Sequence, residues 1–362
     1  MNKLEEIKQE LVPHLVNERV FCEPGSREFI ELDSIEIEET KSEWSSYDRV
    51  CKLYRGKVNI KFSGEVKTFP VFIKEEVLHH SNSCVKIQNE ICFYKEIAPK
   101  LGLTSIPKCY WTGKYQDQGL NYIILEDLQA EGYKVVKSRR LDKEHMKLAL
   151  EAIAKIHGKG LSFKDNNYNE FRHVSKLLTT IPPEMYTITT LGSIKRLQKY
   201  LTSRYSHSQF GAIAKSIDKL LESKNMDDIY GHYSPIFNEC ENDIFTICHG
   251  NFTRDNLMYK YNGNIPEAVK VIDWKSARYS SPLVDLYSVI FLNSTSTEWS
   301  HVVVEQNLYT QALRSVYSNI PTSFMQQEFK KKLEYALLKA GYYEDMSYER
   351  LDNILSAIES RV

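Results

Sequence analysis

About a third of the way along the chain, the spacing of apolar residues changes from a pattern typical of strands to one typical of helices. This change limits the possible folds more than any other feature of the sequence. The segments "GKVNIKF" and "TFPVFIKEEV" are rich in β-branched and aromatic residues around Gly64, which predicts an antiparallel hairpin. In "DKEHMKLALEAIAKIHGKGL" the apolar residues Met146, Leu150 and Ile153 recur at helical spacing. The first third therefore reads as strands and the rest mostly as helices.

Helix and strand boundaries follow from local signals. Asp142 is a suitable N-cap for the long helix, and Gly158 is expected near its end. The segment "SCVKIQNEICFYKEIAPKL" predicts an earlier helix, which Pro99 is expected to stop. Between these two helices, "NYIILEDL" predicts a short apolar strand that ends in two acidic residues.

Composition excludes several classes of function. The 362 residues carry 47 Lys and Arg against 48 Asp and Glu, so no overall field favours nucleic acid or an anionic membrane. The charged N-terminus lacks the apolar core of a secretory signal, and no later run approaches the length of a membrane span. The seven scattered cysteines are typical of reduced thiols. We therefore expect a cytoplasmic protein.

The segment at 247 to 286, "ICHGNFTRDNLMYKYNGNIPEAVKVIDWKSARYSSPLVDL", has the residue types of a metal and phosphate site. Asn256 and Asp273 flank an Asn262-Gly263 turn, so a hairpin would bring an amide oxygen and a carboxylate together. Such oxygens suit Mg²⁺ that bridges two phosphates. The alternative is that both residues only cap ordinary turns.

A lysine and an acid earlier in the chain are candidates for the same chemistry. Lys74 ends "VFIK", which matches a strand pattern whose lysine contacts the phosphates of ATP. In a strand, Lys74 shares a face with Phe72 and points away from Val71 and Ile73. Glu90 on the following helix could pair with Lys74 and hold it in place. Taken alone, both are ordinary surface charges.

Taken together, these motifs resemble the ecdysteroid-kinase-like (CHK kinase-like) family, which is kin to choline and aminoglycoside kinases. The residues that carry the resemblance are "HGNFTRDNLMY" followed by "VIDWKSARYSSPLVDL", with "VFIK", "NEICFYKEIAPKL", "YIILEDLQAEGYK" and "LEAIAKIHGKGL" in the family's order over roughly residues 45 to 295. The resemblance implies an α+β, two-lobed protein-kinase-like fold. Its mainly antiparallel β lobe would span residues 1–126, and its larger helical lobe residues 127–362.

The resemblance also implies a role for each site residue. ATP would lie in the cleft, with its adenine against the linker from Glu126 to Leu128. Lys74 would bind phosphates and Glu90 would anchor Lys74. The other implied site residues belong to the second half of the chain: Asn256 and Asp273 for Mg²⁺, Asp285 as a structural carboxylate, His249 as a residue that shapes the catalytic loop, and Asn251 at the catalytic position.

Two departures from the family pattern bear on activity. Asn251 stands where the family has its catalytic Asp, and an amide cannot usefully accept the proton of a substrate hydroxyl. No glycine occurs between Gly25 and Gly56, where the family usually has a glycine turn over the phosphates, and Ser46 stands about there. Asp255 is a second candidate base, although on an extended loop it would face a different way from Asn256.

Two functions from different classes remain open from the sequence. The first is an ATP- and Mg²⁺-dependent phosphotransferase that acts on the hydroxyl of a small molecule, such as an ecdysteroid, a choline-like compound or a xenobiotic alcohol. The second is a pseudokinase that binds nucleotide, ligand or a protein partner without turnover. A third possibility is an unrelated α+β protein in which the motifs occur by chance. The acceptor pocket is expected largely from residues 165–245 and the C-terminal helices, where no motif is recognisable.

Overall fold

The computed structural model describes residues 3–40, 51–77, 81–115, 120–138, 140–179, 195, 198–204, 215, 244–293, 299–321 and 324. The chain divides into two compact units. Unit 1 contains Met1–Lys134 and Lys270–Lys275, and unit 2 contains Val135–Val269 and Ser276–Val362. The predicted lobe boundary after residue 126 stays a prediction. Ser46 and most of the region predicted for the acceptor pocket lie outside the described residues.

Unit 1 is built on a five-stranded antiparallel sheet in the order β1-β2-β3-β5-β4. The strands are β1 (Ile30–Thr40), β2 (Cys51–Phe62), β3 (Glu65–Glu76), β4 (Cys109–Lys114) and β5 (Asn121–Glu126). The predicted hairpin is confirmed, because Phe62 pairs with Glu65 across a two-residue turn. Ser63 and Gly64 in that turn have φ angles of 39° and 106°, as a tight hairpin of this kind requires.

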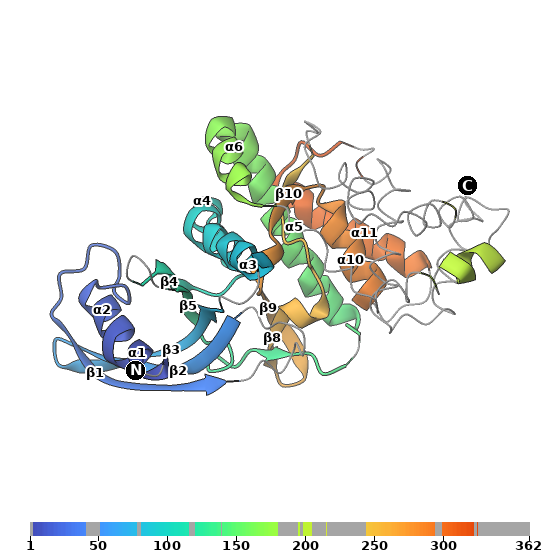
Figure 1. Ribbon diagram of the computed structural model, residues 1–362. Helices are drawn as coiled ribbons and strands as arrows, with labels where there is room; N and C mark the ends of the chain where they lie inside the picture. Colours follow the sequence, from blue (N-terminus) through green and yellow to red (C-terminus); the bar gives the residue numbers. More distant parts are fainter. Residues whose placement is uncertain are drawn as a thin grey trace. The chain divides into compact units, whose positions relative to one another are not determined.

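The start of the chain is helical, so the expectation of strands throughout the first third is wrong there. The helices α1 (Lys3–Glu6) and α2 (Val12–Asn17) are joined by a π-helical turn, Ile7–Leu11, and lie against the long strands (Figure 1). Ile7, Leu11 and Leu15 recur at i+4 and are buried in one core with sheet residues such as Val71 and Ile73. Charged residues lie between these positions, so the apolar stripe is not obvious in the sequence.

A second helical segment in unit 1 runs through the proline that was expected to stop it. It consists of α3 (Ser81–Cys92), a π-helical turn (Phe93–Ile97) and α4 (Ala98–Leu101). Pro99 lies in the first turn of α4, where its missing N–H costs little. The helix ends instead at Gly102, whose φ of 54° is the left-handed conformation typical of a C-terminal cap.

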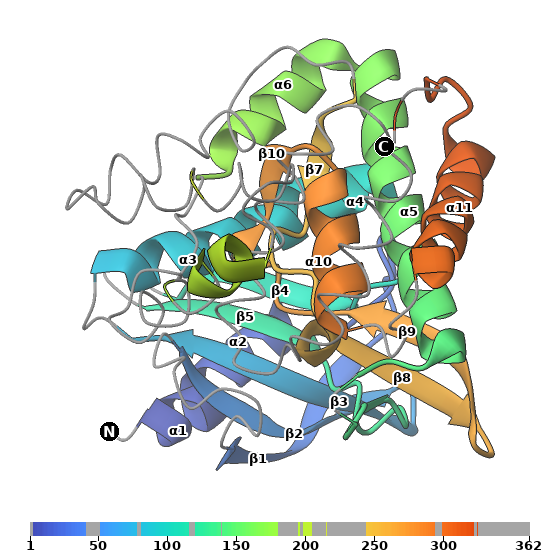
Figure 2. The ribbon, with the colours of Figure 1, turned by 90° about the vertical axis from the view of Figure 1, so that its right-hand side faces the viewer.

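Unit 2 is mainly helical. Its helices are α5 (Lys143–Asn166), α6 (Tyr168–Leu177), α10 (Leu283–Asn293) and α11 (Trp299–Val316). Its strands are β7 (Thr246–Cys248), β8 (Leu257–Asn262), β10 (Arg278–Ser280) and the parts of β6 (Lys134–Val135) and β9 (Ile265–Val271) that lie outside unit 1. α5 and α11 lie side by side (Figure 2). β7 pairs with β10, and a second small sheet has the order β6-β8-β9. The hairpin predicted around Asn262-Gly263 is thus present as β8 and β9.

The long helix α5 begins as predicted and ends later than predicted. The side chain of Asp142 accepts hydrogen bonds from the backbone N–H groups of Glu144 and His145, which confirms the N-cap. The helix continues past Gly158 because that glycine and Gly160 serve close packing. A Cβ atom at Gly160 would lie 2.2 Å from Thr246 Oγ1, so only glycine lets α5 approach β7 this closely.

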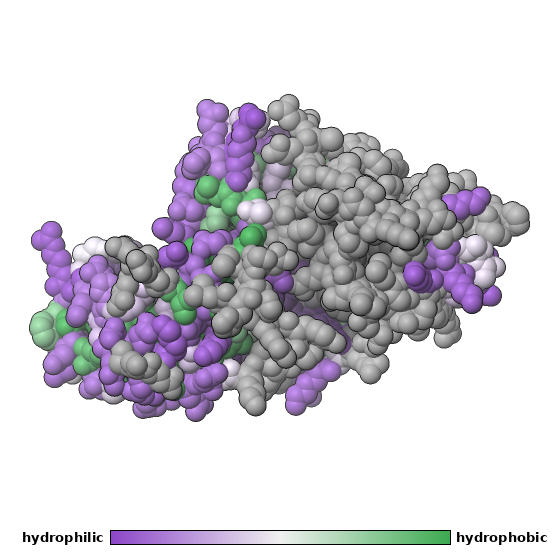
Figure 3. Space-filling view, viewed as in Figure 1, coloured by the Kyte–Doolittle hydropathy of each residue, from purple (hydrophilic) through white to green (hydrophobic). Residues whose placement is uncertain are grey.

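Antiparallel strands dominate one unit and helices the other, which confirms the predicted α+β fold class. The described part of the surface in Figure 3 is mainly hydrophilic, with small hydrophobic areas between the charged side chains. Among the helices in the described ranges, none combines the length and apolar character that crossing a bilayer requires.

Candidate active site

Lys74 and Glu90 form a buried ion pair in unit 1. Lys74 lies on β3, and its neighbours Val71 and Ile73 point into the core on the other face. Its Nζ atom lies 2.8 Å and 2.9 Å from the two carboxylate oxygens of Glu90 on α3. Only 13% of the lysine side chain and 3% of the glutamate side chain are exposed. The strand therefore holds an ammonium group at a fixed position.

Asp273 joins this pair in unit 1, although it is 199 residues from Lys74 in the sequence. Its Oδ1 atom lies 3.4 Å from Lys74 Nζ, and its Oδ2 atom lies 3.0 Å from Lys275 Nζ. The backbone of Asp273 is left-handed, with φ of 67°, a conformation that few residues other than glycine adopt. Among residues other than glycine, Asp is one of those that adopt this conformation most readily.

The segment that carries Asp273 is anchored firmly. The ring of Trp274 stacks on Phe93 with centroids 3.8 Å apart and an angle of 4° between the planes. Asn89 Nδ2 donates to the backbone oxygen of Lys275 at 3.3 Å. The backbone N–H of Val271 donates to Ser105 O at 2.8 Å. Residues 270–275 thus form part of the core of unit 1.

Pairing with carboxylates shifts the pKa of Lys74 more than burial does. Burial alone would lower the pKa of Lys74, but the carboxylates of Glu90 and Asp273 raise it above its usual range. Burial raises the pKa of Glu90, and Lys74 opposes that shift. Burial lowers the pKa of Lys275 to about 8, while the Asp273 carboxylate at 3.0 Å favours the charged ammonium. The cluster therefore places two ammonium groups around one carboxylate.

Glu126 and Leu128 lie where β5 ends. Glu126 Oε1 accepts hydrogen bonds from the backbone N–H of Lys108 at 2.9 Å and from Lys270 Nζ at 3.3 Å. Leu128 is buried, and the Asp127 carboxylate beside it pairs with Arg55 Nε at 2.9 Å. The linker is thus fixed by its own side chains.

In unit 2 the loop after β7 carries His249, Gly250 and Asn251. Asp285 on α10 accepts hydrogen bonds from the backbone N–H groups of His249 at 2.7 Å and of Gly250 at 2.9 Å. Gly250 has φ of 79°, and a Cβ atom there would lie 2.1 Å from Ser276 O, so glycine is required. One buried carboxylate therefore sets the course of the loop.

Asn251 and Asn256 lie at the two ends of this loop and are bonded to each other. The backbone N–H of Asn251 donates to His249 Nδ1 at 3.1 Å, and its backbone oxygen accepts from Asn256 Nδ2 at 2.8 Å. Because the amide nitrogen of Asn256 is used in this way, its oxygen Oδ1 is the atom available to a metal. Asp255 instead pairs with Arg254 at 3.2 Å and is 40% exposed.

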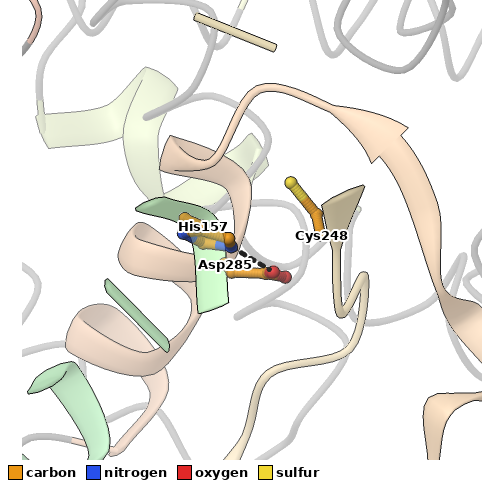
Figure 4. A group of neighbouring side chains, drawn as sticks. All are labelled: His157, Cys248 and Asp285. Carbon is orange, nitrogen blue, oxygen red and sulfur yellow. Dashed lines mark hydrogen bonds and ion pairs between the residues drawn. The ribbon is translucent and has the colours of Figure 1, made fainter. Parts of the chain in front are cut away.

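His157, Cys248 and Asp285 lie close together, with their potential ligand atoms within 4.8 Å of one another (Figure 4). His157 Nε2 lies 3.1 Å from Asp285 Oδ2, and His157 Nδ1 lies 2.7 Å from the Tyr309 hydroxyl, so both ring nitrogens are used. Burial raises the pKa of the Cys248 thiol well above its usual range, which keeps it protonated. His157 and Asp285 join α5, α10 and α11 to the loop, whereas the Cys248 thiol donates to the backbone oxygen of Ser280.

We expect Asp285→Asn to destabilise the protein by about 3 kcal/mol, because it leaves buried donors without an anionic acceptor. Burial alone would raise the pKa of Asp285, but hydrogen bonding and charge from His157 and His249 lower it below 3.8. A carboxylate with a lowered pKa contributes stability above pH 3.8 that is lost as the pH falls through its native value. Urea unfolding between pH 7 and pH 3 measures this.

The acid-dependent loss of stability should be smaller in Asp285→Asn than in the wild type. Asp255→Asn is the matched control, since that carboxylate is partly exposed and its change should cost less than 1 kcal/mol. An Asp285→Asn variant as stable as the wild type would contradict the role of this carboxylate.

The structure brings three of the predicted site residues together in unit 1, namely Lys74, Glu90 and Asp273. In unit 2 it brings together His249, Asn251 and Asn256. Sequence reasoning missed Lys275 and His157. The signal for His157 was a histidine on the apolar face of a strong helix, and Lys275 gave no signal beyond its position two residues after Asp273.

An α+β fold with a lysine–glutamate pair beside an aspartate, together with a loop anchored by a buried carboxylate, is the arrangement of a kinase-like phosphotransferase. The chain belongs to the ecdysteroid kinase-like family, whose model matches residues 50–336. The predicted family is therefore confirmed. No curated protein sequence matches the chain significantly.

Several solved structures are similar to the chain at low identity. Wild-type aminoglycoside 2'-phosphotransferase-IIIa, solved as its GDP complex, has 12% identity and a TM-score of 0.40, with 100% of both chains covered. Aminoglycoside-3'-phosphotransferase of type VIII has 12% identity and a TM-score of 0.40, with 84% of this chain and 93% of that chain covered. Plasmodium vivax ethanolamine kinase has 11% identity and a TM-score of 0.36, with 90% and 81% covered.

Proposed function

We propose that the protein transfers the γ-phosphoryl group of ATP to the hydroxyl of a small molecule, with Mg²⁺ as the metal. The acceptor classes are an ecdysteroid, a choline-like compound or a xenobiotic alcohol. The observation that carries the proposal is the cluster of Lys74, Glu90 and Asp273 in unit 1. Family membership supports the same reaction class.

In this proposal Lys74 binds the phosphates of ATP. An ammonium held by Glu90 loses little conformational freedom when phosphate arrives, since its position is already fixed. The adenine lies against the linker from Glu126 to Leu128. The backbone N–H groups of Glu126 and Asp127 donate to Lys108 O at 2.9 Å and Pro70 O at 3.0 Å, so the linker offers a rigid edge to the base.

The proposed metal ligands are Asp273 and Asn256. A carboxylate oxygen and an amide oxygen are hard donors of the kind that Mg²⁺ prefers, so the residues fit the ion. Bound Mg²⁺ would neutralise charge on the phosphates during transfer. The left-handed backbone of Asp273 and the bond from Asn256 to the Asn251 backbone each fix a donor in advance.

Asn251 occupies the catalytic position in this proposal. Its amide oxygen can hold the acceptor hydroxyl in line, but it cannot accept the proton as a carboxylate does. General-base assistance contributes about 10²- to 10⁴-fold to such reactions, so we propose slow transfer. The same residue favours the second candidate, a pseudokinase that binds nucleotide and a protein partner without turnover.

We expect saturating MgATP to raise the melting temperature by about 4 °C, since a ligand at about 100 times its Kd stabilises a protein by about 2.7 kcal/mol. Isothermal titration calorimetry with ATP and ADP, each with and without Mg²⁺, measures the binding directly. MgAMP is a matched control because it keeps the base and lacks the β- and γ-phosphates. A folded protein that binds neither MgATP nor MgADP would contradict the phosphotransferase proposal.

A further inference from the structure

Lys275 contacts a different oxygen of Asp273 from the one that Lys74 contacts. Its Nζ atom lies 3.0 Å from Asp273 Oδ2, and only 14% of its side chain is exposed. The backbone of Lys275 is also fixed, because its oxygen accepts a hydrogen bond from Asn89. An exposed lysine would sample many positions, whereas this one is held at both its backbone and its ammonium group.

The carboxylate of Asp273 therefore has a cation on each oxygen. Lys74 lies 3.4 Å from Oδ1, and Lys275 lies 3.0 Å from Oδ2. A magnesium ion binds carboxylate oxygen at about 2.1 Å, which is close enough to repel an ammonium group on the same oxygen. For a metal to bind Oδ2, the Lys275 ammonium has to leave it.

Lys74 is the second cation at this carboxylate. Its ammonium is shared with both oxygens of Glu90, at 2.8 Å and 2.9 Å. The contact between Lys275 and Asp273 is shorter than the contact between Lys74 and Asp273. Lys275 is therefore the cation that competes directly at this carboxylate.

We propose that Lys275 is a tethered cation that competes with a divalent metal ion for Asp273 and weakens metal binding there. This inference rests on the proposed function, which assigns Asp273 as a metal ligand. In this role Lys275 sets how tightly the site binds a metal ion. When no metal is bound, the Lys275 ammonium neutralises the Asp273 carboxylate.

Mn²⁺ is the probe for this competition, because the free ion is counted directly by electron paramagnetic resonance. We expect Lys275→Gln to bind Mn²⁺ at least tenfold more tightly than the wild type in the absence of nucleotide. Lys275→Arg keeps the charge and should bind Mn²⁺ as weakly as the wild type. Added Mg²⁺ should displace the Mn²⁺ that Lys275→Gln binds.

Two further variants assign the effect to Asp273. The double variant Lys275→Gln/Asp273→Asn should lose the gain in affinity. Lys67→Gln removes the same charge from an exposed position on β3, seven residues from Lys74 and so about 23 Å along the strand. It should leave Mn²⁺ binding unchanged. Melting temperatures of all variants check that they are folded.

The inference is overturned if Lys275→Gln binds Mn²⁺ no more tightly than the wild type, or if Lys67→Gln produces an equal gain. It is also overturned if the gain persists when Asp273 is replaced. Because these titrations contain no nucleotide, they decide the role of Lys275 separately from the proposed reaction. Failure of that reaction would instead be seen as absence of MgATP binding in the wild type and in Lys275→Gln alike.

Discussion

Asn251→Asp should increase phosphoryl transfer by at least tenfold, and by as much as about 10²- to 10⁴-fold if proton transfer limits the rate. Asparagine and aspartate have nearly the same shape, and the backbone of Asn251 is held by His249 and Asn256. The new carboxylate should therefore take the place of the amide without moving the loop. Release of ADP, measured with and without a panel of small alcohols, gives the rate.

The control for this variant is Asp255→Asn, which changes the neighbouring carboxylate. Asp255 pairs with Arg254 and is 40% exposed, so its loss should change the rate less than threefold. If Asp255→Asn lowers the rate and Asn251→Asp does not raise it, Asp255 is the base. If Asn251→Asp binds MgATP and gains no activity, the catalytic assignment of position 251 is wrong.

Lys74→Met should abolish detectable MgADP binding and destabilise the protein by about 3–5 kcal/mol. The destabilisation follows because Glu90, 3% exposed, would lose the cation that compensates its buried charge. The double variant Lys74→Met/Glu90→Met should recover most of the stability, since an apolar pair can replace a buried ion pair at little cost. It should not recover nucleotide binding, because the phosphate-binding ammonium is absent.

Urea unfolding and calorimetry on both variants separate stability from binding. Lys67→Met, on the exposed part of the same strand, is the matched control and should change neither by more than about 0.5 kcal/mol. Lys74→Met that binds MgADP as tightly as the wild type would remove Lys74 from the phosphate site. A double variant as unstable as the single variant would show that the loss does not come from the uncompensated glutamate.

The sequence predicted those parts of the fold that depend on local periodicity. Enrichment in β-branched and aromatic residues around Gly64 predicted the hairpin of β2 and β3. The period of two predicted that Lys74 lies on the other face of the strand from Val71 and Ile73, as the structure has it. The acidic residue Asp142 predicted the start of α5. These features need only neighbouring residues, so a single sequence contains the information.

The predictions that were wrong concern features that a short stretch of sequence does not show. Gly158 lies inside α5 because Val316, far along the chain, leaves no room for a side chain there. Glycine was taken as a helix end because its conformational freedom is visible locally, whereas close packing is not. His157 was missed for the same reason, since its partner Asp285 lies 128 residues away along the chain. Lys275 lies only two residues from Asp273, but their contact depends on side-chain geometry that no sequence pattern shows.

Residues 270–275 pack into unit 1, although the chain on both sides of them belongs to unit 2. A fragment ending at Lys134 would therefore lack Asp273 and the indole ring that covers Phe93. All five strands of the N-terminal sheet precede residue 127, whereas residues 270–275 are synthesised only after Val135–Val269 of unit 2. Unit 1 therefore receives its last segment when more than half of unit 2 has already been translated.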